Sequence, residues 1–186
     1  MKKSLIIGIV LIIICLGLTI YNEFINRPVN LYTITNSGKK LENKKVYLDI
    51  TFVAGTITDN YYVMFGDGVQ YIVYIDNREA NKINRYLLDN PESSYKIYGI
   101  TKLIPNSIEE NGKKFVKEWL DNNHNHTGEI EEHDHNITTD EFYHYFGYVY
   151  LDTENNFEII KLINYLTGIV GILIVFYSIN TKYHLI

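Results

Sequence analysis

Two long apolar runs, one at each end of the chain, constrain its fold more than any other feature. The first covers residues 5–21 and consists almost entirely of Ile, Leu, Val and Gly, with no charge. As a helix it is about 25 Å long, close to the thickness of a bilayer's hydrocarbon core. Lys2 and Lys3 also fit the basic start of a signal peptide, but residues 19–23 contain no small-x-small cleavage site. We therefore expect an uncleaved transmembrane anchor.

The second run, residues 158–179, also has the length and composition of a transmembrane helix. Its only charges, Glu158 and Lys161, lie in its first turn, and a lysine so close to the interface can extend its ammonium group into water. Gly168 and Gly171 are spaced too closely to predict a strong helix-packing motif.

Lysines stand just outside both runs, in the segments 1–4 and 180–186. Basic residues flanking membrane spans favour the cytoplasm, so we expect both segments to be cytoplasmic and residues 22–157 to form one extracytoplasmic domain. Arg27 and the lysines between positions 39 and 45 lie on the outer side and weaken this bias.

The middle of the chain is acidic, because all 22 Asp and Glu residues lie between Glu23 and Glu158. A protein that binds nucleic acid needs a basic footprint, which this domain lacks, so no nucleic-acid partner is expected. The only cysteine, Cys15, lies in the first apolar run. The outer domain therefore has no disulfide, and its hydrophobic core must stabilise it.

Alternating β-branched and aromatic residues predict an antiparallel meander in the first half of this domain. A long strand with a bulge at Gly55 is expected over 46–58, followed by strands at 61–65 and 69–75 that are joined by a Gly-Asp-Gly turn. The last strand is apolar on both faces, so helices must cover part of the sheet. Residues 22–43 are expected to be a linker with one short strand over 31–34.

Helices and two more strands follow. A capping box between Asp76 and Glu79 predicts a helix to about residue 89, and a second box at 107–110 starts another helix with Trp119 in the core. A further strand is expected over 95–104. Three more predictions end the domain: a polar segment from residue 122, a short helix capped by Thr138 and Glu141, and a closing strand over 147–151.

The order of a long bent strand, two strands, a helix and the strand Tyr95-Lys96-Ile97-Tyr98-Gly99-Ile100-Thr101 resembles a small OB-like barrel. The whole chain resembles the two-pass membrane proteins of bacteria that carry such a domain. The resemblance rests on residues 46–104 and implies an α+β fold, mainly antiparallel β, without implying a ligand. The OB fold binds oligonucleotides on a basic, aromatic groove, but this domain is acidic. We therefore assign the tyrosines of the meander to sheet packing or to a protein-binding surface: Tyr61, Tyr62, Tyr71 and Tyr74.

One constellation has the spacing of metal ligands, in a His-rich loop over residues 122–137. It contains two His-x-His pairs on either side of a glycine: His124 and His126, then His133 and His135. Residues two apart on an extended backbone point the same way, so each pair can offer two imidazoles to Zn²⁺, Ni²⁺ or Cu²⁺. Glu132 or Asp134 can add an oxygen ligand. A plain solvated loop and a pH-sensing loop are the alternatives.

No nucleophile elbow, phosphate loop or zincin helix occurs in the chain, and His144 beside Asp140 and Glu141 fits a solvated helix face. The sequence therefore favours a membrane-anchored, non-enzymatic module whose outer domain binds another protein or an envelope component. The alternative is extracytoplasmic binding or sensing of a divalent metal by the His-rich loop.

Overall fold

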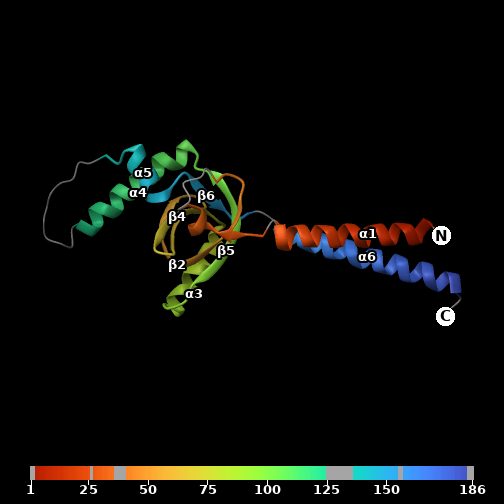
Figure 1. Cartoon of the computed structure of the whole chain (residues 1–186). Coiled ribbons are helices and arrows are strands. Elements are labelled where there is room, and N and C mark those ends of the chain that lie inside the picture. Colours follow the sequence, from red (N-terminus) through yellow and green to blue (C-terminus); the bar gives the residue numbers. More distant parts are fainter. Residues whose placement is uncertain (1–2, 26, 36–40, 125–135, 155–156, 184–186) are drawn as a thin grey trace. The chain divides into compact units, whose positions relative to one another are not determined.

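The chain consists of two compact units, which are described separately (Figure 1). The first unit combines Met1–Arg27 with Asn156–Ile186, and the second is Pro28–Asn155. The computed structural model describes residues 3–25, 27–35, 41–124, 136–154 and 157–183.

The first unit is a pair of helices. Helix α1 (Lys3–Ile20) continues into a short π-helical segment, η1 (Tyr21–Ile25), and its partner is α6 (Phe157–Tyr183). Both helices are long and apolar enough to cross a membrane. The helical segments contain the predicted spans 5–21 and 158–179 and extend beyond them at both ends.

Polar contacts show that α1 and α6 run antiparallel along each other. Three of them are spread over the length of the pair: Ser178 Oγ to Ser4 Oγ at 2.8 Å, Asn164 Nδ2 to Thr19 Oγ1 at 2.9 Å, and Lys161 Nζ to Glu23 Oε1 at 3.1 Å. Asn164 is buried although it lies inside an apolar run, and hydrogen bonds between helices are the usual role of such a residue.

Glycines let the two helices approach closely, so the prediction that Gly168 and Gly171 make no strong packing motif is wrong. A Cβ atom at Gly168 would lie 2.6 Å from Cys15 Sγ, and one at Gly171 would lie 3.1 Å from the carbonyl oxygen of Gly8. A spacing of three residues suits this contact, because the contact face of α6 repeats every three and four residues. Its members are Asn164, Gly168, Gly171, Val175 and Ser178.

The second unit contains one mixed sheet. Its strands are β1 (Val29–Asn30), β2 (Lys45–Thr58), β3 (Tyr61–Gly66), β4 (Val69–Tyr74), β5 (Tyr95–Leu103) and β6 (Val149–Asp152). Four pairings are antiparallel, β2–β3, β3–β4, β2–β5 and β5–β6, while β4–β6 and β1–β2 are parallel. The pairings β2–β3–β4–β6–β5–β2 form a closed cycle.

Strand β2 closes this cycle because it pairs with different neighbours along its length. Residues 45–50 pair with β5, and residues 50–58 pair with β3. The register shifts between Val53 and Gly55, which confirms the predicted irregularity there. A bulge bends a strand, and this bend lets β2 turn from one neighbour to the other.

All five strands of the cycle contribute side chains to one core, which we call the inner cluster. Its strand members include Val46, Leu48, Ile50, Met64, Tyr71, Val73, Ile97 and Leu151. Helix α3 (Asn77–Asp89) adds Ala80, Ile83 and Leu87 to the same core. The predicted two-sided apolar pattern of β4 is confirmed, because Tyr71 and Val73 face this cluster while Ile72 faces away.

A second core, the outer cluster, lies on the opposite face of β3 and β4. Val63 and Ile72 belong to it, and helices α4 (Asn106–His124) and α5 (Thr139–Phe146) cover them (Figure 1). The largest covering side chain is Phe142, whose exposed fraction is 0%. Helices therefore cover this face, as the pattern of β4 required.

Three local predictions are wrong. Residues 31–34 lie in a short helix, α2 (Leu31–Thr35), since only a helix puts Leu31 and Ile34 on the same side, where both contact the inner cluster. Asp76 caps α3 by accepting from the backbone of Arg78, not of Glu79.

Trp119 is 41% exposed and is not a core residue. The buried stripe of α4 has a spacing of four: Ile108, Gly112, Val116 and the half-buried Leu120. Trp119 lies about 100° around the helix from Leu120, beside this stripe.

Candidate functional site

The outer surface of the strand cycle has one covered and one uncovered part. Helices α4 and α5 cover β3, β4 and the second half of β2, where Ala54 and Ile57 pack against the outer cluster. The outward side chains of β5 and of residues 45–49 of β2 remain accessible among the described residues. We call this uncovered part the β2–β5 face, and its members alternate with buried residues: Lys45, Tyr47, Asp49, Lys96, Tyr98, Ile100 and Lys102. Tyr98 is its most prominent aromatic residue, with an exposed fraction of 52%.

Register places the aromatic and charged members of this face in contact. Tyr47 lies opposite Tyr98, with ring centroids 6.2 Å apart, and Asp49 lies opposite Lys96, with Nζ and Oδ1 3.6 Å apart. Lys96 Nζ also lies 4.3 Å from the centre of the Tyr47 ring. Ion pairing and cation–π attraction together hold the lysine over the aromatic pair.

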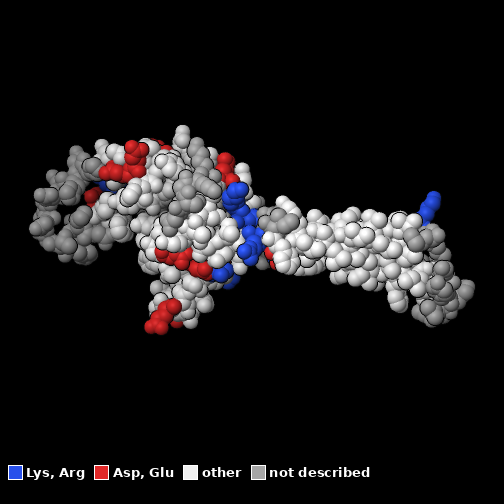
Figure 2. Space-filling model, viewed as in Figure 1, with Lys and Arg blue, Asp and Glu red and all other residues white. Residues whose placement is uncertain are grey.

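Basic side chains gather over β5, as Figure 2 shows. Lys102 forms an ion pair with Asp152, whose side chain is only 6% exposed whereas that of Lys102 is 45% exposed. The hydrogen bond to Asp152 raises the pKa of Lys102 above its usual value. Because the carboxylate is buried and the ammonium group is not, positive charge reaches the surface here.

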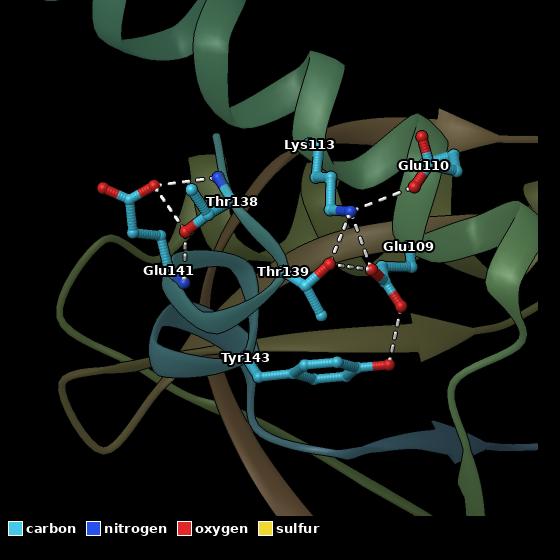
Figure 3. Close-up of polar contacts among 7 residues, drawn as sticks. All are labelled: Glu109, Glu110, Lys113, Thr138, Thr139, Glu141 and Tyr143. Carbon is cyan, nitrogen blue, oxygen red and sulfur yellow. Dashed lines mark hydrogen bonds and ion pairs between the residues drawn. The ribbon is translucent and has the colours of Figure 1, made fainter. Parts of the chain in front are cut away.

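A polar network joins α4 to α5 above the outer cluster (Figure 3). Glu109 is the centre of this network, and its carboxylate accepts hydrogen bonds from Thr139 Oγ1 at 2.9 Å and from the Tyr143 hydroxyl at 2.8 Å. Lys113 Nζ lies 2.7 Å from the same carboxylate and also donates to Thr139 and Glu110. The two helices are 15 residues apart in the chain, and this network fixes them together.

Helix α5 begins with the predicted capping box, which is confirmed. Thr138 Oγ1 accepts from the backbone N–H of Glu141 at 3.2 Å, and the Glu141 carboxylate accepts from the backbone N–H of Thr138 at 2.8 Å. A reciprocal cap satisfies two backbone donors that a helix start leaves open. It fixes where α5 starts and thereby where Thr139 and Tyr143 meet Glu109.

The pKa shifts in this network suit a structural role. Hydrogen bonds from Lys113 and Tyr143 lower the pKa of Glu109, while burial, with the help of Glu109, raises the pKa of Tyr143 to about 12. An acid–base catalyst works best with a pKa near the ambient pH, and both shifts move away from neutrality. The network therefore holds a charged carboxylate and a neutral phenol in fixed contact.

We predict that Glu109→Gln lowers the unfolding free energy of the domain at neutral pH and lowers it much less in acid. The lowered pKa of Glu109 gives stability that is complete above the reference value of 4.5 and is lost as the pH falls through the folded-state value. Urea unfolding of the full chain in micelles, from pH 7 down to pH 3, measures the difference in unfolding free energy between the two proteins. Glu110→Gln is the control, since that side chain is 67% exposed. A difference that stays constant down to pH 3 contradicts the prediction.

The predicted metal ligands lie at the edge of, or outside, the part of the chain that the structure describes. His124 is the last residue of α4, and His126, His133 and His135 lie outside the described residues. Within the described ranges no group of three or more His, Cys, Asp and Glu residues is arranged to hold a metal ion. The site for Zn²⁺, Ni²⁺ or Cu²⁺ stays a prediction.

The four tyrosines assigned to packing or to a binding surface serve in packing. Tyr71 is buried in the inner cluster, Tyr62 packs against that cluster, and Tyr61 and Tyr74 pack against the outer cluster. The exposed Tyr98 was not among the residues predicted to form a binding surface. The alternation of Lys96, Tyr98, Ile100 and Lys102 in a predicted strand was a signal that could have identified it.

Comparisons of the chain with family models, with curated proteins and with solved structures find no match.

Proposed function

We propose that the chain is a membrane-anchored, non-enzymatic module whose outer domain binds another protein through the β2–β5 face. The observation that carries the proposal is the contrast between the two outer surfaces. The chain's own helices occupy the surface of β3 and β4, whereas the Tyr47–Tyr98 pair is left ordered and accessible. Exposed tyrosines with little freedom of movement are typical centres of protein interfaces.

An OB-like barrel is the fold that we propose for the outer domain. The closed cycle of five strands, the parallel β4–β6 pair and the helix between β4 and β5 support it. OB folds bind oligonucleotides and oligosaccharides on the middle strands, and α4 and α5 lie on that part of the cycle here. This arrangement favours a protein ligand on the opposite strands.

We propose that α1 and α6 both span the membrane, with both termini in the cytoplasm. The antiparallel contacts between the helices and the flanking lysines support this topology. A reporter enzyme that works only in the cytoplasm is expected to be active when it is fused after Ile186, whereas an enzyme that works only after export should be inactive there. Activity of an exported reporter at the same position would overturn the topology.

A photocrosslinking amino acid at position 98 tests the binding function. In living cells it is expected to join the full chain to one recurring protein, because the β2–β5 face forms the interface. The same amino acid at Asp140, an exposed position of α5, is the matched control. Deleting residues 125–135 should leave the crosslink at position 98 unchanged. Equal crosslinking at both positions, or none at position 98, contradicts the proposed interface.

A further inference from the structure

We infer that the β2–β5 face binds an acidic polypeptide segment, with an apolar centre flanked by Asp or Glu. This inference rests on the proposed function and specifies the partner of the same surface.

The order of residues along β5 gives the pattern that a ligand must match. Tyr98 and Ile100 form an apolar centre, and Lys96 and Lys102 stand on either side of it along the same strand. From Lys96 to Lys102 the strand covers about 20 Å, the length of a segment of about six extended residues. A segment with acidic ends and an apolar middle matches this order.

The charge of the face differs in sign from that of the domain around it. Residues 28–155 contain 20 acidic and 12 basic residues, whereas the β2–β5 face presents three lysines and one aspartate. Asp49 pairs with Lys96, and the mostly buried Asp152 pairs with Lys102, so three lysines stand against two carboxylates here. An acidic ligand is therefore attracted to this face and repelled by the rest of the domain.

The contacts of the two strands also define how the ligand is held. Backbone groups of β2 from Lys45 to Ile50 pair with those of β5 from Tyr95 to Ile100, so a ligand cannot join this pair as a strand between them. Side chains must make the contacts. Lys96 already lies over the Tyr47 ring, which removes one ring face on which a sugar could stack. A polypeptide suits this surface better than an acidic glycan does.

A peptide assay tests the inference with the full chain in nanodiscs. The probe is a fluorescent nine-residue peptide with two glutamates at each end and a centre of valine and leucine, and its counterpart carries lysines at both ends. Fluorescence anisotropy is expected to show binding of the acidic probe only. Lys96→Glu and Tyr98→Ala should each weaken that binding at least about tenfold, because they remove the attraction and the apolar centre. Lys114→Glu makes the same change of charge on an exposed part of α4 and should have no effect.

Several results would overturn the inference. They are equal binding of both probes, no binding of the acidic probe at millimolar concentration, an unchanged affinity in Lys96→Glu, and competition by an oligogalacturonate. The proposed function fails separately, when position 98 crosslinks to no protein in cells. A protein crosslinked at position 98 through a neutral or basic segment would refute the acidic ligand and leave the interface standing.

Discussion

Replacing Phe142 by Ala is expected to lower the unfolding free energy of the sheet-containing unit, Pro28–Asn155, by about 4 kcal/mol. Phe142 is fully buried, and its ring lies in such close contact with Gly112 of α4 that no Cβ atom fits there. The ring also packs against Phe146, with centroids 5.2 Å apart. Its loss therefore leaves a cavity between α4, α5 and the sheet, which cannot collapse without moving both helices.

Chemical unfolding of the full chain in micelles measures this effect, followed by the fluorescence of Trp119, the only tryptophan. Phe142→Leu should cost clearly less, since it keeps most of the apolar volume. Tyr148→Ala removes an aromatic ring that is 63% exposed and serves as the control. If Phe142→Ala costs no more than Tyr148→Ala, the outer cluster does not hold the helices on the sheet.

Gly99→Ala is expected to destabilise the same domain by about 3 kcal/mol, a large effect for one added methyl group. A Cβ atom at Gly99 would overlap the carbonyl oxygen of Asp152 and lie 2.7 Å from Leu151 Cδ1. Both belong to β6, and Ile100 pairs with Asp152 in that strand. Because the obstacle is backbone, the added atom can be accommodated only by moving β6 away from β5.

Gly55→Ala is the matched control for this substitution. Its Cβ atom would meet the ring edge of Phe115 at 3.1 Å, and a half-buried side chain can shift where a paired backbone cannot. Urea unfolding should therefore show a cost below about 1 kcal/mol for Gly55→Ala. Similar costs for the two variants would mean that the contact between β5 and β6 does not limit the fold.

Local signals predicted the elements of the sheet-containing unit well. The two faces of β4, the bend of β2 near Gly55 and the cap of α5 at Thr138 and Glu141 all depend on residues within a few positions of one another. Patterns of this kind are visible in a sequence, because the side chains that decide them are neighbours in the chain. Where two local solutions compete, as in α2, contact with the inner cluster decided between helix and strand.

The pairing of the strands could not be predicted from the sequence, because it depends on contacts between residues far apart in the chain. Lys44 contacts Thr101 and Asp152 contacts Gly99, which are separations of 57 and 53 residues, and no local pattern states which strand closes the cycle. The candidate site also depends on contacts between distant parts of the chain. Glu109 owes its network to Thr139 and Tyr143 of another helix, and Tyr47 meets Tyr98 only through the register of β2 and β5.

The two ends of the domain lie on strands β1 and β6 of the same sheet, and this has a consequence for engineering. Val29 pairs with Val46, Val46 pairs with Gly99, and Ile100 pairs with Asp152. Three strand spacings, about 14 Å, therefore separate Val29 near the start of the domain from Asp152 near its end. Domains whose ends lie close together tolerate circular permutation and insertion into other proteins. Here a short Gly-Ser linker can connect the two ends, so that new termini can be opened elsewhere or the unit can be inserted into a loop of another protein.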